Sequence, residues 1–289
     1  MIIVRIWEGL GNQLFQYAYA RALQLRTGEM VCLDASRIYK EKLEDRGVER
    51  RYALNQFNTK LPLISNISNK YFFLSQSNFM QKTIYWMAEH HMWFTGFYKE
   101  EDTLYKENLK SIYGNLYLMG WFQNEKYFLE YRNILLKELT PTKKIKISQL
   151  LKSILKNEMT ISVHVRRGDF KKNNNVLPVS YYKKAKEFVE TKVSNPCYII
   201  FSDDTEWVKK NLDFGLNVVY MCEEGLRDYE ELLVMSCCKH NIIANSTFSW
   251  WGAWLNKNED KIVVGPMQWF NQKQDVQKYN IMPDKWIRI

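Results

Sequence analysis

The chain of 289 residues is poor in cysteine and proline, with five and six respectively, and it has no long apolar run. The cysteine count is odd and no Cys-x-x-Cys pair occurs, which argues against a disulfide framework and a four-cysteine zinc site. No stretch approaches the ~20 apolar residues of a membrane-spanning helix. Arg5 and Glu8 interrupt the apolar start, which is unlike a signal peptide. These absences favour the reducing cytoplasm.

Composition excludes a disordered chain, because 46% of the residues are hydrophobic and 25% are charged. The length predicts about two domains. The net charge of +9 points to an anionic ligand, to nucleic acid or to acidic membrane headgroups. An ordinary lysine-rich surface would give the same charge, so the partner must be sought in the motifs.

The first half opens with a strand, a turn, a helix and a second strand. Residues 2–7 and 31–34 have strand patterns, and the helix between them ends at Gly28. This order predicts a parallel sheet. Residues 36–115 include an aromatic-rich segment at 71–102, where we expect helices and loops covering the sheet. A strand at 116–119 and a helix after Gln123 follow.

The second half alternates strands and helices, which predicts a doubly wound parallel sheet. We expect strands at 160–165, 197–201, 218–222, 241–244 and 262–264, with helices at 180–193, 205–212, 228–238 and 248–255. A lysine-rich segment with Pro141 separates the two halves. We therefore place the domains at 1–145 and 146–289.

Three polar motifs follow strands of the second half, namely "HVRRGD", "FSDD" and "ANSTFS". Ligands of open parallel sheets bind beyond the carboxyl ends of the strands, so we expect these motifs to converge at one sheet edge. The "GLGNQ" turn of the first half also follows a strand and can face the same cleft. Two such sheets with a ligand between them are typical of sugar-nucleotide enzymes.

Arg166 and Arg167 follow a buried strand, so their charges need anionic partners. One interpretation is an ion pair with Asp169 or another carboxylate. The other is a diphosphate clamp, because guanidinium binds phosphate oxygens bidentately and stays charged. Strand alternation puts His164 and Arg166 on one face of the strand and Arg167 on the other. We therefore expect Arg166 to bind the ligand and Arg167 to have a structural role.

The turn "ANSTFS" presents Asn245, Ser246 and Thr247 where a strand leads into a helix. Any of the three can cap the helix, and the same turn directs backbone N–H groups at an anion. In "FSDD", Asp203 and Asp204 can cap a helix, bind a nucleobase or ribose, or hold a metal. The arginines could already neutralise a departing diphosphate, so no metal is expected.

Two other function classes fit the motifs less well. "GLGNQLF" is a partial dinucleotide motif, with Asp34 where a ribose-binding acid could stand, but Leu14 occupies the position of its third glycine. Asn12 and Gln13 suit sugar hydroxyls better. A nucleic-acid-binding protein would carry lysines and aromatics along a groove, whereas the arginines here cluster at a strand end, which favours a compact phosphate.

The chain resembles bacterial α-1,2-fucosyltransferases of glycosyltransferase family 11. "GLGNQLFQYAYARAL", "GWFQNEKYF", "VHVRRGDF", "CYIIFSDDTEWVKKNL" and "IIANSTFSWWGAWL" read as that family's blocks, in its order, over residues 9–255. The resemblance implies a GT-B fold, with two Rossmann-like domains whose parallel sheets face a central cleft. It implies inverting transfer of fucose from GDP-β-L-fucose to the 2-hydroxyl of a terminal galactose, without a metal or other cofactor.

The family's blocks also imply roles for individual residues. His164, Arg166 and Arg167 are expected at the diphosphate, and Asn12 and Gln13 at the sugar. Further donor-binding residues are expected in the second half: Ser202, Asp203, Asn245, Ser246, Thr247, Phe248 and Ser249.

Glu8 departs from the family, whose members often have glycine there. We interpret it as a structural change; the alternative is a carboxylate that helps to deprotonate the acceptor. Asp169 is the other candidate base, and Arg166 with His164 would stabilise the departing GDP. The expected acceptor is a galactose-terminated glycan or a lipid-linked oligosaccharide, which is compatible with peripheral contact at the inner face of a membrane. A different linkage or acceptor is the nearest alternative.

Overall fold

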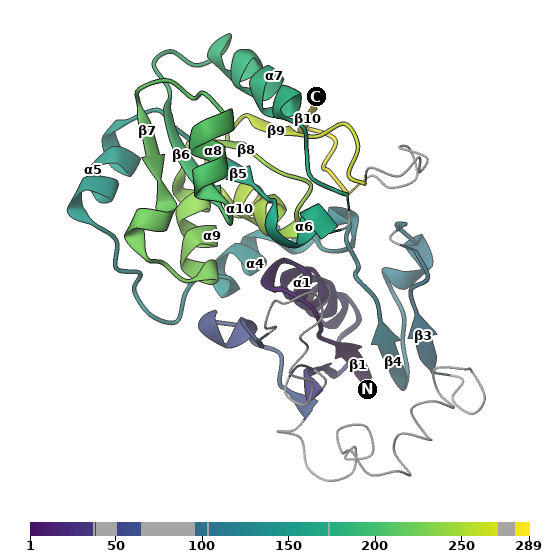
Figure 1. Cartoon of the computed structure of the whole chain (residues 1–289). Coiled ribbons are helices and arrows are strands. Elements are labelled where there is room, and N and C mark those ends of the chain that lie inside the picture. The colour runs from purple at the N-terminus through teal and green to yellow at the C-terminus, as the bar shows by residue number, and fades with distance from the viewer. Residues whose placement is uncertain (37, 39–50, 65–95, 103, 173, 271–280) are drawn as a thin grey trace. The chain divides into compact units, whose positions relative to one another are not determined.

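The computed structural model describes residues 1–36, 38, 51–64, 96–102, 104–172, 174–270 and 281–289. The chain divides into two compact units, Met1–Thr142 and Lys143–Ile289 (Figure 1). The division falls after Thr142, whereas the predicted boundary lies after residue 145. Each unit contains a parallel sheet and helices, which confirms the α/β class.

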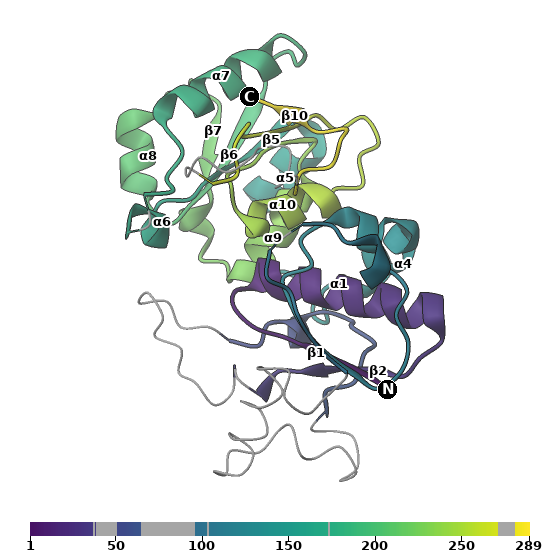
Figure 2. The same ribbon diagram turned by 90° about the vertical axis from the view of Figure 1, so that its right-hand side faces the viewer.

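The first unit has a four-stranded parallel sheet in the order β2-β1-β4-β3. Helix α1 runs beside β1 and β2 (Figure 2). The elements are β1 (Ile2–Arg5), α1 (Leu10–Thr27), β2 (Val31–Asp34), β3 (Phe97–Lys99), β4 (Leu116–Met119) and α4 (Arg132–Glu138). Short 3-10 turns lie at Leu54–Gln56, Glu107–Leu109, Glu125–Tyr127 and Leu129–Tyr131.

Helix α1 is the predicted first helix. Leu14, Ala18 and Ala22, which recur at helical spacing, are fully buried. Gly28 ends the helix with a φ of 70°, a left-handed conformation that glycine adopts without a steric penalty. Its N–H donates to the carbonyl of Gln24 at 2.9 Å. The predicted helix and its end are therefore confirmed.

Two expectations in this unit were wrong in detail. Phe97–Lys99 forms strand β3 where helices and loops were expected, because Phe97 pairs beside Tyr117 of β4 and packs into a buried apolar cluster. The helix after Gln123 begins only at Arg132 and follows two 3-10 turns. The aromatic residues at 71–95 lie outside the described residues.

The second unit has a six-stranded parallel sheet in the order β10-β9-β8-β5-β6-β7. Its strands are β5 (Thr160–Val165), β6 (Cys197–Ser202), β7 (Val218–Tyr220), β8 (His240–Ile242), β9 (Val263–Gly265) and β10 (Ile287–Arg288). Its helices are α5 (Gln149–Asn157), α6 (Gly168–Lys172), α7 (Val179–Glu190), α8 (Thr205–Asn211), α9 (Asp228–Cys237) and α10 (Thr247–Leu255), with a 3-10 turn at Met221–Glu224. The predicted alternation is confirmed; α5, α6 and β10 are additional.

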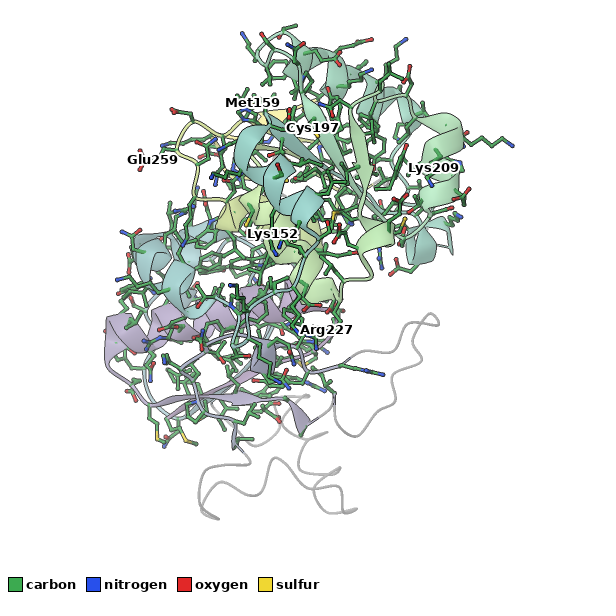
Figure 3. The ribbon with its side chains drawn as sticks, turned by 90° about the vertical axis from the view of Figure 1, so that its left-hand side faces the viewer. Lys152, Met159, Cys197, Lys209, Arg227 and Glu259 are labelled. Carbon is green, nitrogen blue, oxygen red and sulfur yellow. The ribbon has the colours of Figure 1, made fainter. Side chains whose placement is uncertain are left out.

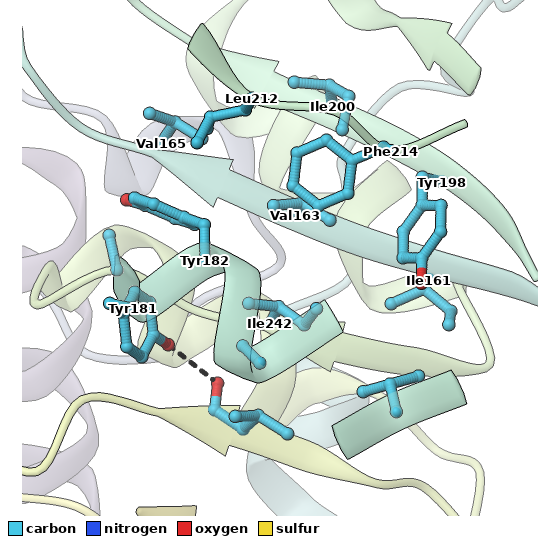
Figure 4. Packing of buried hydrophobic residues seen from close by; sticks show 14 of the residues in the cluster. Ile161, Val163, Val165, Tyr181, Tyr182, Tyr198, Ile200, Leu212, Phe214 and Ile242 are labelled. Carbon is cyan, nitrogen blue, oxygen red and sulfur yellow. Dashed lines mark hydrogen bonds between the residues drawn. The ribbon is translucent and has the colours of Figure 1, made fainter. Parts of the chain in front are cut away.

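Both faces of this sheet are covered. Ile161, Val163 and Val165 of β5 belong to a buried cluster with Tyr181 and Tyr182 of α7 (Figure 4). On β6, Ile199 and Phe201 belong to a second cluster, which includes residues of α5 and α9.

The alternate residues of β5 are polar and yet buried. Ser162 is 1% exposed, and its hydroxyl accepts a hydrogen bond from Asn241 Nδ2 at 2.7 Å. His164 is 5% exposed. A central parallel strand is buried on both faces, so its polar side chains need partners inside the protein.

In the described part of the chain, no helix has the length and apolar character needed to cross a membrane.

Candidate active site

The strand order of the second unit brings the three polar motifs together. β5 lies between β8 and β6, and all three strands are parallel, so "HVRRGD", "FSDD" and "ANSTFS" meet at one sheet edge. From β5 the chain adds β6 and β7 on one side and then crosses to β8 and β9 on the other. The predicted convergence is confirmed, and it lies at the switch point where open parallel sheets bind ligands.

Two carboxylates hold the Arg166 guanidinium. Nε donates to Asp169 Oδ1 at 3.0 Å, and Nη2 lies 2.9 Å from the same oxygen. Nη1 lies 2.9 Å from Asp203 Oδ2. The Asp169 side chain is 5% exposed, whereas that of Arg166 is 25% exposed. The guanidinium is thus fixed by protein groups and still has solvent-accessible surface for a ligand.

Arg167 has a different set of contacts. Its Nε donates to Asp204 Oδ2 at 3.1 Å, and its guanidinium lies 3.5 Å from the centre of the Trp207 ring. Lys171 approaches the same Asp204 oxygen at 2.5 Å and is the main reason that the pKa of Asp204 is lowered. The aspartates of "FSDD" therefore pair with the arginines. An ion pair with an unspecified carboxylate was predicted for the arginines, but not this pairing for Asp203 and Asp204.

Asp203 also binds the backbone that follows β5. Its carboxylate accepts hydrogen bonds from the N–H groups of Arg167 at 2.8 Å and Gly168 at 3.1 Å. A Cβ atom at position 168 would lie 2.8 Å from Asp203 Oδ2, closer than real Cβ contacts allow. Glycine at 168 thus permits the approach of this carboxylate.

His164 is a neutral, buried histidine. Burial and the neighbouring charge of Arg166 lower its pKa to about 3. Its ring centre lies 5.5 Å from that of Phe248, at the start of α10. Its Nδ1 is buried and has no hydrogen-bond partner among the described residues. A neutral imidazole with an open ring nitrogen can accept from or donate to a ligand, depending on its tautomer.

Asn245 has a fixed amide with an open acceptor. Its Nδ2 donates to the carbonyls of Asn175 at 2.9 Å and Trp269 at 3.1 Å, which defines the orientation of the amide. Its Oδ1 is buried without a partner in the described part of the chain. A buried acceptor of this kind gains free energy when a ligand donates to it.

The residues after Asn245 differ in accessibility. Ser246 is the N-cap of α10 and makes no side-chain capping bond, and Thr247 and Phe248 are also partly exposed. Ser249 is fully buried, and its hydroxyl donates to the carbonyls of Ala244 and Ser246 at 3.4 and 3.2 Å. Three tryptophans of α10 are buried, as expected for core residues: Trp250, Trp251 and Trp254.

In the first unit, β1 and β4 are neighbours at the corresponding switch point. Glu8, just after β1, has a φ of 63°, a left-handed conformation that favours glycine. Its carboxylate accepts a hydrogen bond from Asn12 Nδ2, and Asn12 Oδ1 accepts one from Gln123 Nε2 at 2.8 Å. This chain of side-chain bonds joins the ends of the two strands.

Gln13 is completely buried, and backbone groups use both ends of its amide. Nε2 donates to the carbonyls of Glu8 and Arg51, both at 2.8 Å, and Oε1 accepts from Ala53 N at 2.9 Å. The structure thus gives Gln13 a role in holding a loop to α1, and the expected contact with a sugar stays a prediction. Ser202 similarly accepts from the backbone N–H of Asp204 at 3.0 Å.

Sequence reasoning missed three side chains around these sites. Trp207 stands three residues after Asp204 in a predicted helix, and this spacing could have placed its ring beside Arg167. Lys171 lies in the unpredicted helix α6. Glu100 is buried in the first unit, where burial raises its pKa to about 7, and it accepts from the N–H groups of Trp121 and Phe122. Its partners come from a distant strand end, so no local pattern indicates it.

Among the residues that the structure describes, no three His, Cys, Asp or Glu side chains are grouped as metal ligands. Asp203 and Asp204 instead face the two arginines and a lysine. Metal independence is not tested by this arrangement and stays a prediction.

Comparisons with known proteins agree with the motif analysis. The model of glycosyl transferase family 11 matches residues 1–289. The chain is 30% identical to an alpha-1,2-colitosyltransferase of Escherichia coli, over 100% of this chain and 99% of the relative. It is 32% identical to the O-antigen biosynthesis glycosyltransferase WbnK of Escherichia coli, over 97% of this chain and 98% of the relative.

Among solved structures, the fucosyltransferase NodZ from Bradyrhizobium is a distant likeness. It has 13% identity and a TM-score of 0.46, and the match covers 87% of this chain and 91% of that chain. The family match spans both units and all five motif blocks. The chain is therefore a glycosyltransferase and belongs to glycosyl transferase family 11.

Proposed function

We propose that this glycosyltransferase transfers L-fucose from GDP-β-L-fucose to the 2-hydroxyl of a terminal galactose, with inversion and without a metal. The observation that carries the proposal is the oriented, partly exposed guanidinium of Arg166 at the switch point of the second sheet. Family membership supplies the reaction class, and relatives named for α-1,2 transfer support the linkage.

The main task in this reaction is to stabilise charge on the departing diphosphate. As the bond between the sugar and GDP breaks, negative charge grows on a β-phosphate oxygen. Arg166 would bind that oxygen through its exposed edge, and Asp169 and Asp203 would hold the guanidinium ready. Fixed donors need no reorganisation during the reaction, which makes this kind of stabilisation effective.

Neighbouring groups would complete the donor site. The start of α10 at Ser246 and Thr247 offers backbone N–H groups and the positive end of a helix dipole. Asn245 Oδ1 can accept a hydrogen bond from a hydroxyl or N–H group of GDP-fucose. His164 is neutral, so it adds no positive charge beside Arg166.

The acceptor hydroxyl must lose a proton. Asp169 suits the orienting role better than the role of base, because it is buried and bound to Arg166. Glu8 stays the candidate base to be tested.

The test is transfer from GDP-fucose to lactose, with the new linkage located by NMR. Arg166→Ala should lower kcat roughly 10²- to 10³-fold, the usual effect of losing a donor to the developing charge. Arg227→Ala is the matched control, because Arg227 is an exposed arginine of the same unit paired with Glu230. Near-normal transfer by Arg166→Ala would refute the phosphate-binding role.

Colitosyl transfer is the second candidate, because a colitosyltransferase is similar over this whole chain. Initial rates with GDP-fucose and GDP-colitose, measured on one acceptor, separate the two. A higher kcat/KM for GDP-colitose would reassign the donor and leave the phosphate site as proposed.

A further inference from the structure

The start of the second unit carries an unusual concentration of positive charge. Residues 143–157 contain five lysines and no aspartate or glutamate. All five lysines are exposed, and they define what we call the α5 lysine surface: Lys143, Lys144, Lys146, Lys152 and Lys156. Lys152 and Lys156 are four residues apart on α5 and therefore share a helix face. Figure 3 looks onto α5 and labels Lys152.

No ion pair neutralises these lysines among the residues that the structure describes. Other lysines of this unit do pair, such as Lys171 with Asp204 and Lys209 with Glu223. The nearby Glu224 is engaged by the backbone N–H and hydroxyl of Ser148, at the start of α5. Glu158, just after α5, is exposed. The α5 lysine surface therefore presents a positive field to solvent.

Helix α5 also carries an exposed apolar side chain, Leu150. α5 packs its inner face into the core through Leu151, which is 1% exposed, with Ile154 and Leu155 partly buried. Leu150 is not part of that cluster and is 71% exposed. It stands two residues before Lys152, and side chains two apart on a helix do not face each other, so Leu150 does not share the face of Lys152 and Lys156.

The residue types discriminate between anionic partners. Residues 143–157 contain no aromatic side chain, so they offer no stacking for the bases of a nucleic acid. They contain no arginine, the residue that binds single phosphates bidentately. Several hydrated lysine charges suit a diffuse field of headgroups instead. We propose that the α5 lysine surface docks this protein on a membrane surface rich in anionic lipid.

The experiment is co-sedimentation of the full chain with vesicles of phosphatidylcholine alone or mixed with phosphatidylglycerol. We expect binding only to the anionic vesicles, and weaker binding at high salt. The double variant Lys152→Gln/Lys156→Gln should lower the partition coefficient roughly 25-fold at low salt, about fivefold for each lysine near the surface. Leu150→Ser changes neither the charge nor the face that carries Lys152 and Lys156, so it should bind the vesicles as the wild type does.

Matched controls lie elsewhere in the same unit. Lys183→Gln/Lys184→Gln removes two exposed lysines of α7, and Leu216→Ser removes a fully exposed leucine. Both controls should bind vesicles as the wild type does. Equal losses in the α7 variant, or no binding to anionic vesicles at all, would overturn the proposal. So would retention of RNA or DNA in a filter assay under conditions where the vesicles are not bound.

Discussion

At the residue scale, the candidate sites depend on a few side chains in unusual environments. Arg166 is held by two carboxylates, His164 is buried without charge, and Glu8 adopts a backbone conformation that favours glycine. Each of these conditions has an energetic cost that the surrounding structure offsets. Each therefore leads to a measurable consequence.

Replacing Glu8 with glycine should stabilise the protein. A non-glycine residue in the left-handed region costs of order 1 kcal/mol, and glycine removes that cost while losing the partly exposed bond to Asn12. We expect Glu8→Gly to raise the free energy of unfolding by about 0.5–1 kcal/mol in urea titrations. Asn195→Gly, at an exposed position with positive φ, is the control for backbone strain alone.

The same Glu8→Gly variant separates the two interpretations of Glu8. A large fall in kcat with an unchanged KM would support a role in deprotonating the acceptor. A destabilised variant would instead show that the bond to Asn12 outweighs the backbone strain.

His164 should make stability depend on pH in the acidic range. Its folded pKa of about 3 lies below the ordinary value, so the unfolded chain binds a proton that the folded chain excludes. The stabilisation is complete above pH ~6.5 and is lost as the pH falls toward 3, by up to about 1.4 kcal/mol per pH unit.

The measurement is urea unfolding of the wild type and His164→Asn between roughly pH 7 and pH 5, the upper part of this window. The variant should show a shallower loss of stability on acidification. Equal slopes for the two proteins would mean that His164 is not buried as a neutral group.

At the scale of elements, the position of α10 depends on its packing against α9. Gly252 of α10 has no room for a side chain, since a Cβ atom there would lie 2.3 Å from Met235 Sδ. Met235 is fully buried on α9. This close packing positions the start of α10, where Ser246 and Thr247 stand.

Gly252→Ala should therefore destabilise the protein. Overpacking of a buried contact costs ~1–3 kcal/mol, which exceeds the ~1 kcal/mol that alanine gains in helix propensity. A double-mutant cycle with Met235→Ala, followed by urea unfolding, should show that the smaller side chain relieves the cost. Strictly additive effects would contradict a direct clash between these two positions.

Most elements could be predicted from the sequence because their signals are local. Alternation predicted β5, and the left-handed Gly28 ended α1 where expected. β3 was missed because its residues form a strand only by pairing with β4. α6 was missed because five residues carry too little periodicity to recognise.

At the scale of the whole molecule, the chain itself supplies the cations that a diphosphate needs. The net charge is +9, and Arg166 and Arg167 stand at the candidate donor site. We expect transfer to proceed at the same initial rate with EDTA as without it, in an assay with GDP-fucose and lactose. A loss of rate that Mg²⁺ or Mn²⁺ restores would show that a metal takes part.

The sequence by itself determined the α/β class, the family and the edge at which the motifs meet, since the alternation of strands and helices and the position of each motif after a strand can be read along the chain. Only the tertiary structure decided which groups pair there. The Asp203 side chain accepts a hydrogen bond from the backbone of Arg167, 36 residues away in the sequence. The Gln13 side chain forms hydrogen bonds with the backbone of Arg51 and Ala53, which are 38 and 40 residues away. Such contacts depend on distances in space between segments that no local pattern relates.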